Sequence, residues 1–250
     1  MLVIAHRGAS ANEPENTLRA IARAIALGAD WVEIDVQRVD NALIVIHDDS
    51  LDRTTNGQGP VSAQTLAALR ALDAGRGERI PLLTEVIDLI DARIGLNIEL
   101  KGADVADDVI ALVSDCLRRQ PAWRDRLLLS SFDAAQTARA ARGRHGWRLG
   151  VLFEGDPTAA LERAVALRAD SLHVPLEALT AELVTAVRRA GVAIYVYTVN
   201  ADADLARCLD LGVDGVFSDV PERALTMRAE REIVAVEIEN AEIDDRLREG

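Results

Sequence analysis

Acidic residues alternate with apolar residues in two short segments of the chain, WVEIDV and NIELK. Because side chains alternate between the two faces of a strand, Glu33 and Asp35 share one face of the first segment. Glu99 and Lys101 share a face of the second. Carboxylates buried together without a cation lose hydration and repel one another. Oxygen ligands suit Mg²⁺ or Ca²⁺, whereas zinc normally recruits histidine or cysteine. The pattern predicts one Mg²⁺ or Ca²⁺ ion at Glu33, Asp35 and Glu99, with ion pairs at strand ends as the alternative.

Two histidines stand immediately after segments that predict strands. His6 follows the N-terminal apolar segment, and His47 follows LIVI. Barrel active sites lie at the C-terminal ends of the strands, so we expect both histidines at that face. Histidine donates or accepts a proton near neutral pH, which makes the two a candidate catalytic acid–base pair. Arg7 and Lys101 add charges suited to phosphate oxygens. For each histidine taken singly, a structural role is an equal alternative.

Several other residues with chemical potential have structural interpretations. Asn16 precedes a helical pattern, and we interpret it as the helix N-cap. His145 lies in a glycine-flanked loop and is expected at the surface. His173 falls inside a predicted strand, where lining a pocket and filling the core are equally good interpretations. Tyr195 and Tyr197 share a strand face, either at the cleft floor or in the barrel interior.

Short β-branched segments alternate with longer segments of helical period, which predicts a parallel sheet and, as its simplest closed form, a (β/α)8 TIM-type barrel. Nine segments predict strands, so at least one lies outside an eight-stranded barrel. The nine are Leu2–Ala5, Trp31–Val36, Leu43–Ile46, Leu96–Leu100, Leu127–Ser130, Leu149–Phe153, Ser171–Val174, Ala193–Thr198 and Gly215–Phe217. Residues 49–81 interrupt the alternation, and we interpret them as a small insertion over the barrel mouth. We expect a barrel domain over 1–228 and an acidic tail over 229–250.

Composition limits the partners and the compartment. The 250 residues carry a formal net charge of −13, which opposes binding to nucleic acid or anionic lipid but not to a small phosphate ester held by local cations. No apolar run approaches the roughly 20 residues that cross a bilayer, and no signal peptide is evident, so we expect a cytoplasmic location. Cys116 and Cys208 are predicted to be buried, reduced thiols.

Together these residues resemble the glycerophosphodiester phosphodiesterase family from His6 to about Pro221. Each motif is weak alone, but their order and spacing make the resemblance specific. The motifs are His6-Arg7-Gly8, Pro14-Glu15-Asn16-Thr17, Glu33-Ile34-Asp35-Val36-Gln37, His47-Asp48, Leu51-Asp52-Arg53-Thr54-Thr55, Ile80-Pro81, Glu99-Leu100-Lys101, Ser130-Ser131-Phe132 and Thr198-Val199-Asn200. One departure is Tyr197, which stands where the family frequently has tryptophan and leaves the substrate preference open.

The resemblance implies a barrel with a small insertion and hydrolysis of glycerophosphodiesters to an alcohol and glycerol 3-phosphate. It also implies roles for seven residues. Glu33, Asp35 and Glu99 would hold a divalent cation, His6 and His47 would act as base and acid, and Arg7 and Lys101 would bind the phosphate.

Two other functions remain as alternatives. One is a catalytically silent barrel that binds phosphoesters, and the retention of all seven charged candidates argues against it. The other is a phospholipase D-like barrel acting on lysophospholipids, which the expected acidic surface and the lack of an exposed hydrophobic segment disfavour.

Overall fold

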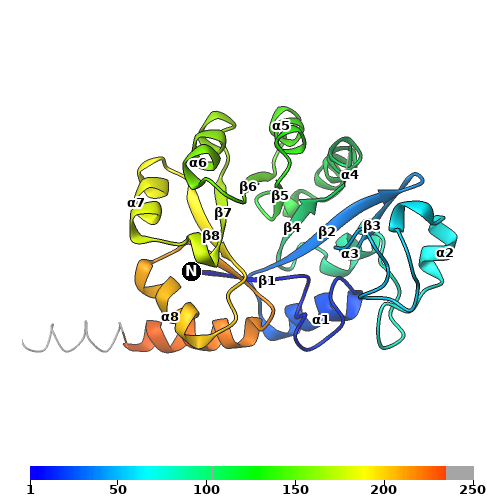
Figure 1. The fold of residues 1–250 in the computed structure, drawn as a ribbon, viewed down its shortest axis with the longest axis horizontal. Coiled ribbons are helices and arrows are strands. Elements are labelled where there is room, and N and C mark those ends of the chain that lie inside the picture. Colours follow the sequence, from blue (N-terminus) through cyan, green and yellow to red (C-terminus); the bar gives the residue numbers. More distant parts are fainter. Residues whose placement is uncertain (103, 235–250) are drawn as a thin grey trace, which may run out of the picture.

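Eight parallel strands close into a barrel in the computed structural model, which describes residues 1–102 and 104–234 (Figure 1). The pairing of β1 with both β2 and β9 closes the ring. The barrel strands are β1 (Leu2–Ala5), β2 (Trp31–Val39), β4 (Gly95–Leu100), β5 (Leu127–Ser131), β6 (Arg148–Leu152), β7 (Ser171–Pro175), β8 (Ala193–Tyr197) and β9 (Gly215–Ser218). The predicted (β/α)8 fold is confirmed.

Helices surround the barrel and bury their apolar faces against the strands. In the first helix, the Thr17 side chain caps the N-terminus by accepting from the Ala20 N–H, and Gly28 ends the helix with φ 83°. The helices are α1 (Leu18–Leu27), α3 (Leu83–Ile90), α4 (Ala106–Arg119), α5 (Ala134–Arg142), α6 (Pro157–Ala166), α7 (Ala181–Arg189), α8 (Asp202–Leu211), a last helix over 221–234, and the short turns η2 (Pro121–Trp123) and η3 (Leu176–Ala178).

The strand outside the barrel is β3 (Ala42–Val45), which runs antiparallel to β2. β2 continues past Val36, where its pairing with β4 ends, and a two-residue turn after Val39 leads back along it. Asp40 in this turn has φ 53°, a left-handed conformation that aspartate tolerates. The sequence alone does not distinguish this returning strand from a barrel strand, because both carry short apolar runs.

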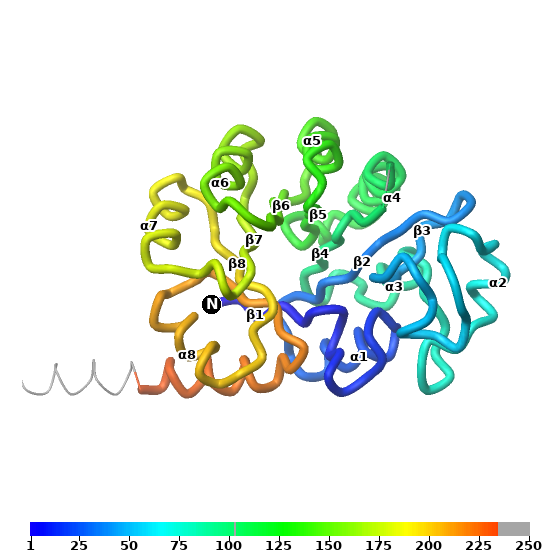
Figure 2. Tube along the Cα trace, viewed as in Figure 1, coloured from blue at the N-terminus to red at the C-terminus, as the bar shows by residue number. Residues whose placement is uncertain are grey.

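Residues 46–82 follow β3 and form a small unit, here called the insertion, with its own apolar core. It contains η1 (Val61–Ala63) and α2 (Leu66–Arg70). Its core consists of Val39, Ile44, Ile46, Leu51, Val61, Leu69, Ala74 and Ile80, of which the first two belong to the β2–β3 hairpin. Figure 2 shows the insertion at the side of the barrel, around this hairpin.

Large side chains fill the barrel interior. Tyr195, Phe217 and Trp31 belong to one buried cluster there. His173 is fully buried among them, with its ring centroid 5.3 Å from that of Tyr195 and 5.0 Å from that of Phe217. Its Nε2 lies 2.8 Å from the Ser171 hydroxyl. Of the two interpretations of His173, the core role is therefore the one the structure supports.

We expect the burial of His173 to make the protein less stable in acid. Burial lowers the pKa of His173 from 6.5 to about 3, so the folded protein keeps the ring neutral where the unfolded chain protonates it. The resulting stability is present above about pH 6.5 and is lost as the pH falls toward 3, with roughly 2 kcal/mol lost between pH 7 and pH 5. Urea unfolding of the wild type and His173→Gln at both pH values measures this loss, which should be smaller in the variant.

The control for this experiment is His145→Gln, which changes an exposed histidine and should keep the wild-type pH dependence. An equal loss in the wild type and in His173→Gln would contradict the expectation.

The last described helix crosses the predicted boundary at residue 228. Arg228 donates to the Met1 carbonyl oxygen and pairs with Asp30 at 2.5 Å, which anchors this helix to the start of the chain. Residues 235–250 of the predicted acidic tail lie outside the described residues. Cys116 and Cys208 are buried and free, as predicted. No helix in the described part of the chain is long and apolar enough to cross a membrane. The cytoplasmic location stays a prediction.

Candidate active site

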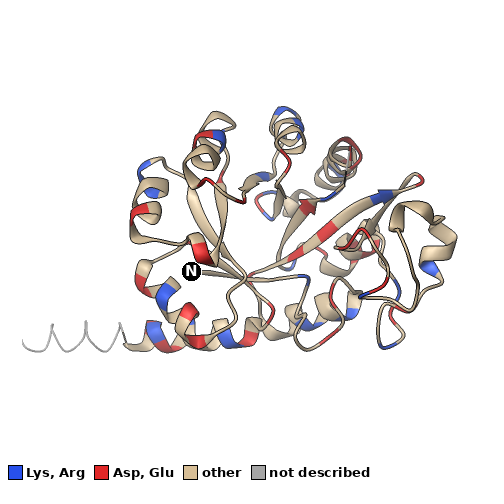
Figure 3. Ribbon diagram, in the orientation of Figure 1, with Lys and Arg blue, Asp and Glu red and all other residues tan. Residues whose placement is uncertain are grey.

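Adjacent barrel strands bring the three predicted metal ligands together. β2 and β4 pair in a register that sets Asp35 opposite Glu99 and Glu33 opposite Asn97. One oxygen from each of the three carboxylates lies within 4.8 Å of the other two, and Glu33, Asp35 and Glu99 are only 2%, 1% and 9% exposed. Figure 3 shows acidic segments of β2 inside the ring of helices. The alternation seen in the sequence therefore becomes a compact, buried carboxylate cluster.

This cluster has the chemistry of a divalent-cation site. Oε1 of Glu33 is buried and has no hydrogen-bond partner among the described residues. Burial, followed by the charges of Asp35 and Glu99, raises the pKa of Glu33 well above its usual value. Burial and the charge of Asp35 also raise the pKa of Glu99. A buried, unpartnered carboxylate oxygen is costly unless a cation coordinates it, so the three residues fit a hard divalent ion.

Two side-chain cations flank the cluster. The backbone N–H of Arg7 donates to Glu33 Oε2 at 2.9 Å, and Nε of Arg7 makes a charge contact of 3.2 Å with Asp35 Oδ2. Nζ of Lys101 lies 3.3 Å from Glu99 Oε1 and 3.6 Å from Asp35 Oδ1. Burial opposes the charge of both cations, but the nearby carboxylates raise the pKa of each. Arg7 and Lys101 therefore stay charged at neutral pH.

His6 is held by a carboxylate at the end of the last barrel strand. Its Nδ1 lies 2.7 Å from Asp219 Oδ1. Asp219 also accepts hydrogen bonds from Asn200 Nδ2 at 2.7 Å and from Ser10 Oγ at 2.9 Å. Burial opposes ionisation, but the hydrogen bonds from His6, Asn200 and Ser10 lower the pKa of Asp219 to about 2. The ionised Asp219 orients the ring and leaves Nε2 of His6 for proton transfer.

His47 has the same kind of partner in the next residue of the chain. Its Nδ1 lies 2.6 Å from Asp48 Oδ1. Gln37 Nε2 donates to the carbonyl oxygens of His47 at 3.1 Å and Asp48 at 3.0 Å, which holds this segment against β2. The predicted reason for the position of His47 was wrong. It reaches the barrel mouth because β3 returns antiparallel along β2, and not because it ends a parallel barrel strand.

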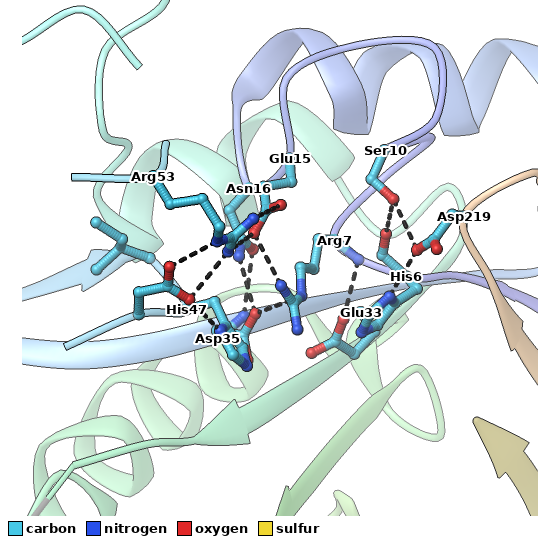
Figure 4. Close-up of polar contacts among 12 residues, drawn as sticks. His6, Arg7, Ser10, Glu15, Asn16, Glu33, Asp35, His47, Arg53 and Asp219 are labelled. Atoms are coloured by element: carbon cyan, nitrogen blue, oxygen red, sulfur yellow. Dashed lines mark hydrogen bonds and ion pairs between the residues drawn. The ribbon is translucent and has the colours of Figure 1, made fainter. Parts of the chain in front are cut away.

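These residues meet at one pocket of about 380 Å³. Figure 4 shows Asp35, Arg7 and Glu33 between His47 on one side and His6 on the other. Six of the seven predicted site residues line the pocket. The seventh, Asp35, lies next to it and contacts two of the lining residues, Arg7 and Lys101. The full lining is His6, Arg7, Glu33, His47, Asn97, Glu99, Lys101, Phe132, Leu152, Glu154, Tyr197, Thr198 and Phe217.

The predicted role of Asn16 was wrong. The N-cap of α1 is the next residue, Thr17, whose side chain accepts from the Ala20 N–H. Asn16 instead donates from Nδ2 to Asp35 Oδ2 at 2.8 Å and accepts from the Asp35 N–H at 3.3 Å. It is 4% exposed. Asn16 therefore orients the Asp35 carboxylate. Its side chain is available for this role because Thr17 caps the helix instead.

Sequence reasoning also missed Asp219, the partner of His6. Asp219 directly follows β9, just as His6 directly follows β1, and these strands are neighbours in the barrel. An acidic residue at a barrel strand end was the available signal. The two residues are 213 positions apart, so only closure of the barrel brings them into contact.

The fold and the site define a TIM-barrel enzyme whose carboxylate cluster, two side-chain cations and two histidines meet at one mouth of the barrel. The model of the glycerophosphoryl diester phosphodiesterase family matches residues 6–223. The chain belongs to this family, as its motifs predicted, and it is an enzyme of the glycerophosphodiester phosphodiesterase class.

Individual relatives match over nearly their whole length. The glycerophosphodiester phosphodiesterase of Caldanaerobacter subterraneus subsp. tengcongensis is 37% identical, with 90% of this chain and 97% of that protein covered. That of Bacillus subtilis is 32% identical, with 89% and 84% covered. An Oleispira antarctica phosphodiesterase, solved in complex with the product sn-glycerol-3-phosphate, has a TM-score of 0.83 at 33% identity, with 92% of this chain and 97% of that chain covered.

Proposed function

We propose that the protein hydrolyses small glycerophosphodiesters to an alcohol and glycerol 3-phosphate, using one divalent cation, Mg²⁺ or Ca²⁺, and His6 and His47 as base and acid. One observation carries this proposal. Both histidines line the same pocket as the carboxylate cluster, and each has its Nδ1 held by an aspartate. Relatives named for this activity, and a similar structure that holds sn-glycerol-3-phosphate, support the same reaction.

Glu33, Asp35 and Glu99 would hold the cation, which supplies positive charge against the negative charge of the reacting phosphate. Arg7 offers a planar fork to two phosphate oxygens, and Lys101 offers a compact second charge. Carboxylates already hold both side chains, so little reorganisation is needed when substrate binds.

The two histidines divide the proton transfers between them. His6 removes the proton of the attacking hydroxyl, from water or from the glycerol 2-position, as that oxygen forms its bond to phosphorus. Attack by water gives glycerol 3-phosphate directly, whereas attack by the 2-hydroxyl gives a cyclic phosphate, whose bond from phosphorus to the 2-oxygen a water must break in a second step to give glycerol 3-phosphate. His47 gives its proton to the oxygen of the departing alcohol as the P–O bond breaks. Asp219 stabilises the imidazolium that forms on His6, and Asp48 stabilises the protonated His47 before transfer.

The pocket wall formed by Phe132, Leu152 and Tyr197 is suited to the alcohol group. The Tyr197 hydroxyl donates to the Phe153 carbonyl oxygen at 2.7 Å, and its ring packs edge-on against Phe132 with centroids 6.0 Å apart. These contacts fix the wall. A pocket of about 380 Å³ fits a small glycerophosphodiester, whereas the acyl chain of a lysophospholipid would extend outside it.

A substrate panel tests the proposed reaction. Glycerophosphocholine and glycerophosphoethanolamine should both release glycerol 3-phosphate, measured with a coupled dehydrogenase assay. For lysophosphatidylcholine, kcat/KM should be at least about tenfold lower, which corresponds to about 1.4 kcal/mol of transition-state binding. Preferred cleavage of lysophosphatidylcholine would support the phospholipase D-like alternative. Binding of glycerophosphocholine without turnover in Mg²⁺ or Ca²⁺ would support the silent barrel.

A further inference from the structure

One residue of the insertion reaches the barrel mouth and bonds to two separate carboxylates. Arg53 donates from Nη1 and Nη2 to the Glu15 oxygens at 2.6 and 2.8 Å. It donates from Nε and Nη2 to the Asp48 oxygens at 2.6 and 2.9 Å. The guanidinium therefore makes a two-pronged contact with each carboxylate, a geometry that a planar fork provides and an ammonium group does not.

Each of these carboxylates in turn holds a residue of the proposed machinery. Asp48 holds Nδ1 of His47 at 2.6 Å, and Glu15 accepts from Nη1 of Arg7 at 2.8 Å. Figure 4 shows Arg53 and Glu15 above His47 and Arg7. A continuous chain of charged contacts thus links the proposed acid to the proposed phosphate-binding cation through Arg53.

The two carboxylates in this series of contacts, Glu15 and Asp48, are less exposed to water than Arg53. Side chains of Glu15 and Asp48 are 20% and 24% exposed, whereas that of Arg53 is 50% exposed. Hydrogen bonds from Arg53, and then from His47, lower the pKa of Asp48, which keeps it ionised at neutral pH. Without Arg53, two carboxylates close to each other would lose their shared cation, and each could turn away from the residue it orients.

We propose that Arg53 is a positioning residue that the insertion supplies to the active site, where it fixes His47 through Asp48 and Arg7 through Glu15. Arg53 is not among the residues that line the pocket. The insertion thereby serves the reaction by setting the direction of Nε2 of His47. This proposal rests on the proposed function, since it assumes that His47 protonates the leaving alcohol.

Arg53→Ala tests the proposal against a matched control, Arg76→Ala. Arg76 is also an exposed arginine of the insertion, and it pairs with Glu13 but with neither Glu15 nor Asp48. We expect Arg53→Ala to lower kcat/KM for glycerophosphocholine by roughly 10–100-fold, the usual effect of removing a partner that orients a site residue. Arg76→Ala should stay within about twofold of the wild type, as a surface substitution outside the site does. Equal activities of the two variants would overturn the proposal.

A second comparison separates positioning from general damage. Loss of the Arg7 contact should slow both esters alike, but loss of the His47 contact should not. Arg53→Ala should therefore slow cleavage of glycerophosphocholine more than cleavage of a p-nitrophenyl ester of glycerol phosphate, whose leaving group hardly needs a proton. In a His47→Ala background, its further effect on glycerophosphocholine should be much smaller than in the wild type, because the two residues act as one unit. Equal losses on both esters, together with additive losses in the double variant, would overturn the positioning of His47 by Arg53.

Two further variants distinguish failure of the positioning role from misfolding and from failure of the proposed acid role. Arg53→Lys keeps the charge but lacks the fork, so it should fold like the wild type and still lose most of the activity. Full activity of Arg53→Lys would overturn the proposal even if Arg53→Ala failed to fold. His47→Ala alone tests the acid role: if it affects both esters equally, the assignment of His47 as the acid fails, whereas unequal losses on the two esters in His47→Ala, with no loss in Arg53→Ala, remove only the positioning role.

Discussion

Removal of the divalent cation is expected to abolish turnover, and added Mg²⁺ or Ca²⁺ is expected to restore it. Glu33, Asp35 and Glu99 would otherwise form a buried acidic cluster, in which one Glu33 oxygen has no partner among residues 1–102 and 104–234. Saturating cation should also raise the melting temperature. At one hundred times Kd the gain is about 2.7 kcal/mol, which is roughly 5–10 °C for a chain of this size. Activity assays and thermal unfolding before and after dialysis against chelator measure both effects.

Glu33→Gln sharpens this experiment. The amide removes one charge from the cluster, so it should abolish both turnover and the thermal shift with Mg²⁺ or Ca²⁺. The cation-free variant should be at least as stable as the cation-free wild type, because the repulsion among buried carboxylates is reduced. Glu182→Gln, an exposed change on α7, serves as control and should keep the shift. Full activity in chelator, with no tightly held metal found by elemental analysis, would rule out the cation site.

Replacement of His47 by alanine is expected to slow glycerophosphocholine cleavage by roughly 10²–10⁴-fold, the usual span for losing a general acid or base. A poor leaving group needs the proton that His47 supplies, whereas p-nitrophenolate leaves without it. The p-nitrophenyl ester of glycerol phosphate should therefore suffer much less. His6→Ala removes the base that activates the nucleophile, so it should impair both esters to a similar extent. Steady-state kinetics on the two esters measure the contrast.

The control for both variants is His145→Ala, since this exposed histidine lies outside the pocket. If His47→Ala damages both esters equally while His6→Ala spares the activated one, the two roles are exchanged. If neither substitution lowers turnover by even about tenfold while the protein still binds its cation, the two-histidine mechanism is wrong.

The fold followed from local patterns in the sequence. Alternating apolar strands and amphipathic helices indicated a (β/α)8 barrel, and the nine predicted strands correspond to β1–β9. The pattern could not show which strand was extra. β3 has a short run of apolar residues, as the barrel strands do. Its antiparallel direction depends on the two-residue turn that begins at Asp40 and on the apolar core of the insertion. Strand direction is a property of the chain connection and the packing partners, and periodicity does not record it.

The site, like the fold, has features that the sequence predicts and others that only the tertiary structure decides. The sequence alone determined that Glu33 and Asp35 share a strand face and that His6 and His47 stand at strand ends, because both follow from the alternation of side chains along a strand. Only the tertiary structure decided which residues orient them. Asp219 meets His6 across 213 positions of chain, Asn16 meets Asp35 across 19, and Arg53 meets Glu15 across 38. Such contacts depend on barrel closure and on the docking of the insertion, which local spacing cannot encode.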